Sequence, residues 1–325
     1  MVEQHLAPVP PDRSLAQLAE TVRRAQDYAQ RAKAPRTRRA YAADWRHFTA
    51  WADARGLTAL PATPETVAFY LADLAEAGAK ASTMARRLVV ISQAHKTQNL
   101  SSPTTSSEVR NVHAGIRRTH GTAQEGKAPA TVDDIKSMLE QLPRSRLGQR
   151  DRALLLLGFA GAFRRSELVS LDVADLDFTR AGLIVTLRRA KTDQEGVGRR
   201  IGIPYGSNKA TCPVRSVQSW LTAAKIKSGA IFRAVDRFGR LQPGRLSDRA
   251  VALVVKRSAQ RVAGLDPERF AGHSLRAGLA TSAAAAGVEE RKIAQQTGHQ
   301  SLLILRRYIR DGDLFRGNAA GAVGL

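Results

Sequence analysis

The sequence predicts a mainly α-helical protein, with a helical first half and a mixed α+β second half that carries a small β-hairpin or sheet. In the first half, apolar residues recur at helical spacing, and no segment alternates apolar and polar residues with a period of two. In the second half, residues 183–187 form a run rich in β-branched side chains, and residues 199–203 are the expected partner strand across a glycine-containing turn. These observations favour two domains of different class.

The helices expected in the first half begin at a serine, a threonine or a proline, which are residues that favour a helix N-terminus. They span residues 14–33, 35–56, 63–78, 82–95 and 106–118. The first has a row of apolar residues at helical spacing: Leu15, Leu18, Val22 and Ala25. The third is expected to turn four residues inward: Val67, Tyr70, Leu71 and Leu74.

A small, polar segment rich in glycine and proline separates the two halves at residues 121–130. We therefore expect a flexible N-terminus over residues 1–13, a helical domain over 14–121, a linker over 122–130, a second domain over 131–311 and a C-terminal tail over 312–325. A capping-type start at Thr131 and Asp134 opens the second domain. Further helices are expected over 150–162, 246–264, 274–287, 289–296 and 301–310.

The charge of the chain points to a polyanionic partner. The sequence has 51 lysine and arginine residues against 29 acidic ones, a formal net charge of +22. Basic residues exceed acidic ones in both halves, which suits two folded domains that grip one polyanion. The longest apolar run, residues 153–163, is too short to span a bilayer, and residues 1–13 lack the apolar core of a secretory signal.

The single cysteine, Cys212, excludes an intramolecular disulfide and a cysteine-based zinc cluster. We therefore expect a cytoplasmic protein that needs no metal, has no membrane partner and binds a nucleic acid.

Cleavage of a phosphodiester without metal requires a nucleophile, cations that stabilise the phosphorane, and an acid for the leaving oxygen. Segments of the second half that can supply these groups lie at residues 161–168, 189–193, 272–276, 297–300 and 306–310. In the first of them, either Arg164 or Arg165 could serve. Taken singly, four of these segments also have a structural explanation: a helix cap or surface ion pair, an edge-strand lysine, a capping histidine, or a tyrosine that packs on an amphipathic helix. The pair His273 and Arg276 in the remaining segment could arise by chance.

Together these segments follow the order of a known active site. An arginine, a hairpin lysine, a His-x-x-Arg pair, a Gly-His pair and a tyrosine nine residues later resemble the tyrosine recombinase (phage integrase) family, most of all its Cre-like members. The resemblance covers about residues 14–320. In the first half, residues 41–48 and 81–88 resemble the core-binding (SAM-like) domain of that family.

The resemblance implies a site-specific DNA recombinase that cuts and rejoins DNA through a 3′-phosphotyrosine intermediate, with neither ATP nor another cofactor. Its implied catalytic residues are Arg164, Lys191, His273, Arg276, His299 and Tyr308. Tyr308 would be the nucleophile, His273 would accept its proton, and Lys191 would protonate the leaving 5′ oxygen. The two arginines would hold the scissile phosphate, and His299 would donate a hydrogen bond to it. Arg165 occupies a variable position.

The implied partner is double-stranded DNA with paired half-sites, bound by a dimer per site and a homotetramer per synapse. The expected DNA-binding residues are Thr37, Arg38, Arg39, Arg86, Arg87, Lys96, Lys256, Arg257 and Arg261. In the tail, Leu314 and Phe315 are expected to dock on a neighbouring protomer. Accessory proteins or a second recombinase remain open as partners.

Two other functions stay open from the sequence. A type IB topoisomerase uses the same tyrosine chemistry but relaxes supercoils, and a catalytically inactive DNA-binding regulator would keep only the fold. The biological task is equally open between phage integration, movement of a transposon or conjugative element, and dimer resolution. For each of these we expect a bacterial, phage-encoded or plasmid-encoded protein that is associated with the nucleoid.

Overall fold

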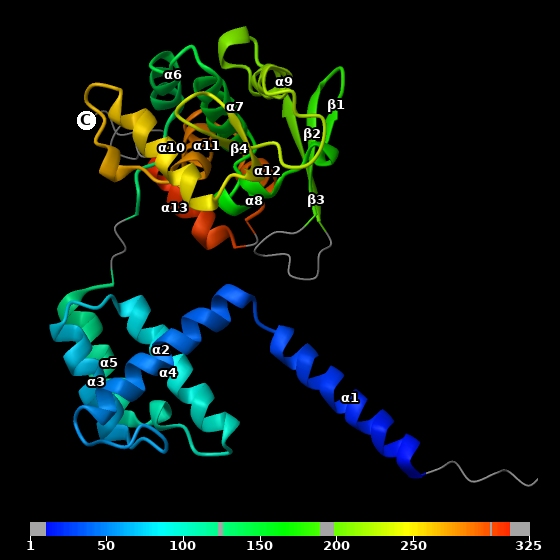
Figure 1. Ribbon diagram of the computed structural model, residues 1–325. Helices are drawn as coiled ribbons and strands as arrows, with labels where there is room; N and C mark the ends of the chain where they lie inside the picture. Colours follow the sequence, from blue (N-terminus) through cyan, green and yellow to red (C-terminus); the bar gives the residue numbers. More distant parts are fainter. Residues whose placement is uncertain (1–10, 123–125, 189–197, 300, 313–325) are drawn as a thin grey trace, which may run out of the picture. The chain divides into compact units, whose positions relative to one another are not determined.

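A computed structural model describes residues 11–122, 126–188, 198–299 and 301–312 (Figure 1). The chain divides into two compact units, Met1–Gln124 and Glu125–Leu325. Each unit has its own hydrophobic core. The fold class expected from the sequence is confirmed: the first unit is helical in its described part, and the second is helical with small antiparallel sheets.

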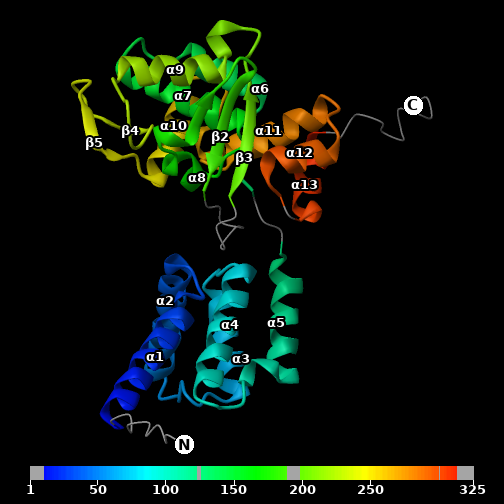
Figure 2. The ribbon, with the colours of Figure 1, turned by 90° about the vertical axis from the view of Figure 1, so that its right-hand side faces the viewer.

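The first unit consists of α1 (Pro11–Arg31), α2 (Pro35–Asp53), α3 (Pro64–Glu76), α4 (Ala81–Thr97) and α5 (Ser107–His120). Helix α3 packs on α5, and α2 packs on α4. The core between them contains Phe48, Tyr70, Leu71, Met84 and Ile91, each almost fully buried. The four residues expected to face inward from α3 are all buried, as predicted. Figure 2 shows the unit from a second side.

The apolar residues of α1 differ from those of α3. The helix forms where the spacing predicted it, but Leu15, Leu18 and Val22 are 65%, 60% and 48% exposed. Helical spacing of apolar residues therefore predicted the secondary structure here correctly, although it did not predict burial. Whether such a row is covered depends on which other element reaches it, and that depends on tertiary packing.

The helices of the second unit are α6 (Val132–Glu140), α7 (Arg146–Ala160), α8 (Arg165–Ser170), α9 (Pro213–Ala223), α10 (Asp248–Gln260), α11 (Ser274–Ala285), α12 (Glu290–Thr297) and α13 (Leu302–Gly312). Helix α7 is apolar over residues 153–157, all buried, and it packs on α9 and α11. The capping box expected at Thr131 and Asp134 begins α6. None of the described helices is long and apolar enough to cross a membrane.

The predicted hairpin forms the central and one edge strand of a three-stranded antiparallel sheet with the order β1-β2-β3. Its strands are β1 (Leu176–Phe178), β2 (Gly182–Leu187) and β3 (Arg199–Pro204). Leu183 pairs with Ile203 and Val185 with Ile201, and all four side chains are buried. Strands β4 (Arg233–Val235) and β5 (Leu241–Arg245) form a second antiparallel pair. The sequence did not indicate β1, β4 or β5, because strands this short carry little periodic signal.

The end of the expected linker belongs to the second unit. The amide of Ala128 donates to the Arg269 carbonyl at 2.7 Å, and the amide of Ala130 donates to the Ser274 carbonyl at 2.9 Å. A Cβ on Gly278 of α11 would lie 1.8 Å from the Ala130 carbonyl oxygen, so this glycine lets the chain pass directly over the helix. The described residues just before 131 are therefore held against α11 instead of serving as a free connection.

The last three helices pack around a small core of their own. Helix α11 packs on both α12 and α13, with Ala280, Ala284, Ile293 and Leu305 buried between them. The hydroxyl of Thr281 on α11 also donates to the backbone carbonyl of Tyr308 on α13, at 3.4 Å. This packing fixes α13 relative to the N-terminal end of α11, where the candidate histidine and arginine lie.

Candidate active site

Arg164 lies in the turn between α7 and α8, and Glu167 holds it in place. The Glu167 carboxylate accepts hydrogen bonds from the backbone amide of Arg164 at 3.0 Å and from its guanidinium at 2.5 Å. The side chain of Glu167 is only 3% exposed, and that of Arg164 is 19% exposed. A buried carboxylate that is bonded twice to one arginine orients the guanidinium and leaves part of it accessible.

The neighbouring Arg165 points elsewhere. Its guanidinium pairs with Asp248 at the start of α10, at 3.2 Å. The residue pattern alone left both arginines open, and the family resemblance assigned the role to Arg164. The two have different partners: Glu167 holds Arg164, and Asp248 pairs with Arg165.

Arg276 lies in the first turn of α11 and is 1% exposed. Its Nη1 donates to the carbonyl of Ala162 at 2.9 Å, and its Nη2 is buried without a hydrogen-bond partner in the described part of the chain. Burial and the nearby Arg164 guanidinium lower the pKa of Arg276 to about 10. The side chain therefore stays charged at neutral pH while one of its donors faces no acceptor.

His273 precedes α11 as its N-cap residue and meets the candidate nucleophile. Its Nε2 lies 2.7 Å from the hydroxyl oxygen of Tyr308, a short hydrogen bond between residues 35 positions apart. The His299 ring also lies near Tyr308, with the two ring centroids 6.0 Å apart. Tyr308 thus lies beside two histidines, one of which can exchange a proton with it directly.

His299 follows Gly298, which ends α12 in the left-handed conformation (φ 65°, ψ 41°). The hydroxyl of Thr297 lies 2.7 Å from the Ile293 carbonyl and 2.7 Å from Nδ1 of His299. A hydroxyl has one proton, and the carbonyl can only accept it, so Nδ1 of His299 must donate to Thr297. In its neutral form, His299 therefore has an unprotonated Nε2.

Burial and the surrounding cations, Arg276 first and then Arg164, lower the pKa of His299 to about 4. A positive charge on this ring is unfavourable in a site that already contains two arginines. With this pKa, His299 is neutral at pH 7, and an anion bound between the arginines would favour its protonation.

The structure brings together five of the six catalytic residues expected from the sequence: Arg164, His273, Arg276, His299 and Tyr308. Lys191 lies outside the described residues. Thr297 was not predicted from the sequence, because a threonine two positions before a histidine has no distinctive pattern. Within the described part of the chain, no cluster of three or more histidine, cysteine and acidic side chains could hold a metal ion.

The expected DNA-binding residues of the first unit fall into two groups. Arg38 and Arg39 on α2 and Lys96 on α4 are exposed, and Thr37 is half-buried. Arg86 and Arg87 on α4 instead reach the carboxylate of Asp44 on α2, at 2.6 Å and 3.6 Å.

Arg87 is the more enclosed of these two arginines. Its side chain is 14% exposed, and it donates to the Tyr70 hydroxyl at 2.9 Å. Burial raises the pKa of that hydroxyl to about 12. The ion pairs of Arg86 and Arg87 with Asp44 therefore also stabilise the packing of α4 on α2.

The expected DNA-binding residues of the second unit lie on or directly after α10. Lys256 pairs with Glu268 at 2.7 Å, whereas Arg257 and Arg261 are exposed. The tail residues Leu314 and Phe315 lie outside the described residues.

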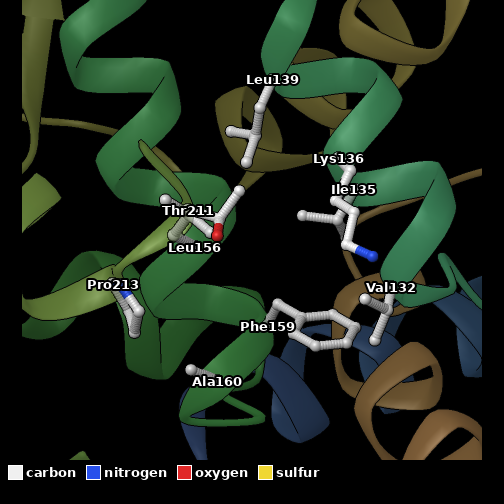
Figure 3. Close-up of a pocket in the computed structure, with 9 residues that line it drawn as sticks. All are labelled: Val132, Ile135, Lys136, Leu139, Leu156, Phe159, Ala160, Thr211 and Pro213. Atoms are coloured by element: carbon white, nitrogen blue, oxygen red, sulfur yellow. The ribbon is translucent and has the colours of Figure 1, made fainter. Parts of the chain in front are cut away.

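A separate pocket of about 210 Å³ lies between α6, α7 and the start of α9 (Figure 3). Its wall is mostly apolar: Val132, Ile135, Lys136, Leu139, Leu156, Phe159, Ala160, Thr211 and Pro213. None of the candidate catalytic residues lines it, so it is not part of the site described above.

Two family models match this chain. The model described as "Phage integrase family" matches residues 130–313, and the one described as "Phage integrase, N-terminal SAM-like domain" matches residues 26–97. The first covers the residues from α6 to the end of α13, including all the candidate catalytic residues.

Curated proteins that are similar along most of their length include two recombinases. An integrase/recombinase XerD homolog of Selenomonas ruminantium is 44% identical over 294 residues, covering 89% of this chain and 86% of the relative. The Cre recombinase of Escherichia phage P1 is 25% identical over 287 residues, covering 82% of each chain.

Solved structures share the fold at lower identity. The XerH recombinase in a post-cleavage complex with its palindromic difH substrate aligns with a TM-score of 0.58 and 17% identity, over 81% of this chain and 71% of that one. A lambda integrase dimer bound to a core site aligns with a TM-score of 0.56 and 18% identity, over 92% of this chain and 95% of that one.

Proposed function

Because this chain belongs to the phage integrase family of tyrosine recombinases, which makes it a site-specific recombinase, we propose that Tyr308 cleaves DNA as a covalent nucleophile. The observation that carries the proposal is the 2.7 Å contact between the Tyr308 hydroxyl and Nε2 of His273. A phenol is a weak nucleophile until its proton is removed, and a base within hydrogen-bond reach supplies that step. In this role His273 accepts the proton as the Tyr308 oxygen attacks phosphorus.

The scissile phosphate binds between Arg164 and Arg276. Attack by Tyr308 places additional negative charge on the non-bridging oxygens, and charged donors held in fixed positions stabilise that charge. Both guanidiniums are fixed by protein groups, Arg164 by Glu167 and Arg276 by the Ala162 carbonyl. The unpartnered Nη2 of Arg276 supports this assignment, because a buried donor without an acceptor is rare unless a ligand supplies one.

His299 donates to the same phosphate once its Nε2 is protonated. In the DNA-free protein Thr297 accepts the proton on Nδ1, and the arginines disfavour a second proton on the ring. An anionic phosphate reverses that electrostatic preference. We therefore expect binding of the scissile phosphate to be accompanied by proton uptake at His299.

Lys191 completes the reaction in this proposal. The phosphorus–O5′ bond breaks as the Tyr308–phosphorus bond forms, and the ammonium of Lys191 gives a proton to the departing 5′ oxygen. The 3′-phosphotyrosine retains the free energy of the broken linkage, so a second 5′ hydroxyl can reverse the step without ATP. The proposal assigns no step to a metal or cofactor.

Both units contact the DNA in this proposal. The exposed basic residues Arg38, Arg39, Lys96, Arg257 and Arg261 contact backbone phosphates, which sets salt dependence more than sequence choice. The remaining candidates contact DNA with the accessible part of each side chain. Arg86, Arg87 and Lys256 do so beside their acidic partners, and Thr37 is half-buried.

Two protomers bind the half-sites of one target, and two such dimers form the synapse. The tail from residue 312 passes to a neighbouring protomer and docks there through Leu314 and Phe315. If deletion of residues 312–325 left cooperative synapsis and cleavage unchanged, this part of the proposal would fail.

The test of the proposed function is to trap the protein on DNA and sequence the attached ends. The expected result is a covalent adduct at recurrent genomic sites, formed by the wild-type chain and absent from Tyr308→Phe. A type IB topoisomerase would instead relax supercoiled plasmid that contains no specific site. A DNA-binding regulator that lacks the chemistry would form no adduct at all, and either outcome would overturn the proposal.

A further inference from the structure

Arg199, the first residue of β3, reaches the end of α12 beside the candidate active site. Its Nη1 donates to the carbonyls of Gln296 at 3.2 Å and Gln295 at 3.4 Å. A Cβ on Gly298 would lie 2.5 Å from the same nitrogen, so the guanidinium rests directly against the residue before His299. β3 therefore places Arg199 beside the segment that positions His299.

The second terminal nitrogen of the Arg199 guanidinium, Nη2, differs from Nη1. Nη2 of Arg199 is buried and has no hydrogen-bond partner there, which is also true of Nη2 of Arg276. A buried donor is normally satisfied by protein or water, so Nη2 of Arg199 and Nη2 of Arg276 can each donate to a group from outside the described protein.

The charges around Arg199 indicate what kind of group its Nη2 would bind. Burial lowers the pKa of Arg199, and Glu167 and Arg164 lie close enough to affect it as well. Arg199 is in turn one of the cations that lower the pKa values of Arg276 and His299. Three guanidiniums thus share this region with the carboxylate of Glu167, which already accepts a hydrogen bond from Arg164. The excess positive charge favours an anion.

We propose that Arg199 is a third arginine of the active site, which binds a non-bridging oxygen of the scissile phosphate through Nη2 while Nη1 holds the end of α12. The inference rests on the proposed function and adds a catalytic residue to it. Arg199 would stabilise the phosphorane together with Arg164 and Arg276, and through Gly298 it would keep His299 at the same phosphate.

A purely structural role would use Nη1 only. An arginine that caps a helix C-terminus satisfies the last carbonyls and is favoured by the helix dipole, but this needs no second donor in a buried position. A capping role does not explain why Nη2 of Arg199 is buried without a partner in the described part of the chain, close to two other arginines.

The test measures the single-turnover rate of adduct formation by the full-length chain, with protein in excess over its measured dissociation constant. The probe is a nicked duplex that carries a cleavage site recovered from wild-type adducts. It is made with either a phosphodiester or an uncharged methylphosphonate at the scissile position. Arg199→Gln keeps amide donors for the carbonyls of α12 but removes the charge. The matched control is Arg200→Gln, which makes the same change at the exposed neighbouring residue of β3.

On the phosphodiester, we expect Arg199→Gln to lower the rate roughly 100-fold and Arg199→Lys, which keeps the charge, to lower it about 10-fold. Arg200→Gln should stay within about twofold of wild type, because an exposed residue does not act on the transition state. On the methylphosphonate the Arg199→Gln defect should shrink to about 10-fold or less, since a phosphate without its negative charge needs fewer cations.

An Arg199→Gln rate equal to wild type, or the same defect on both backbones, would overturn the inference in favour of helix capping alone. If a thermal melt shows that Arg199→Gln does not fold, Arg199→Lys is judged by the same comparison of the two backbones. A wild-type chain that forms no adduct would instead refute the proposed function itself.

Discussion

The pKa of His299 makes a prediction about stability that needs no DNA. Burial, followed by Arg276 and Arg164, lowers this pKa from 6.5 to about 4 in the folded chain. As the pH falls below 6.5, the unfolded chain takes up a proton on this ring and the folded chain does not. The stability that neutral His299 contributes is therefore complete above pH 6.5 and is lost as the pH falls toward 4.

The magnitude follows from the two pKa values. Lowering the pH from 7.5 to 5 would cost the folded state at most about 2 kcal/mol through this group. The ring is only half-buried, so solvent screening reduces the expected cost to about 1 kcal/mol. For a unit of this size, that cost corresponds to a fall in Tm of about 2–4 °C.

The assay is calorimetric unfolding of the full chain at pH 7.5 and pH 5 for the wild type and for His299→Asn. We expect the wild-type transition of the second unit to fall by about 2–4 °C more than that of the variant. His120→Asn removes an exposed histidine at the end of α5 in the other unit, and this control should behave as the wild type. Equal losses in the wild type and His299→Asn would refute the assignment of a depressed pKa to His299.

Three further predictions concern residues of both units. Thr297→Val removes the acceptor for Nδ1 of His299 and should slow adduct formation about 10-fold, whereas Thr297→Ser should stay close to the wild-type rate. Equal rates for the valine and serine variants would count against the fixed tautomer of His299. Asp44→Asn should destabilise the first unit by about 2 kcal/mol in chemical denaturation, because the buried Asp44 carboxylate pairs with two arginines. An unchanged midpoint of the denaturation curve would contradict this. Replacing Arg38 and Arg39 by glutamine should lower the slope of log binding constant against log salt by about 2 in fluorescence anisotropy with duplex DNA. An unchanged slope would show that neither contacts phosphate.

Much of the fold could be predicted because its signals are local. The spacing of apolar residues predicts α3 and its buried face, and Thr131 with Asp134 predicts the start of α6. The β-branched run at 183–187 predicts β2, and residues 199–203 were correctly expected to form its partner strand β3. The order of the catalytic segments predicted the family correctly, although each segment alone could be explained by structure or by chance.

The features that could not be predicted depend on elements that are distant in the sequence. Asp44 and Arg86 lie 42 positions apart and meet only because α2 packs on α4. Arg199 reaches the end of α12, nearly 100 positions later, because of where β3 ends. The exposure of Leu15 on α1 likewise depends on which elements reach that helix, and periodicity alone cannot supply this information.

The identity of the attacking residue is the central claim, and mass spectrometry of the covalent complex tests it most directly. The wild-type chain is trapped on DNA, digested with nuclease and protease, and searched for peptides that carry a nucleotide. The account predicts a deoxynucleotide joined through its 3′ phosphate to the hydroxyl oxygen of Tyr308. A nucleotide attached to any other residue, or an adduct of unchanged yield in Tyr308→Phe, would contradict it.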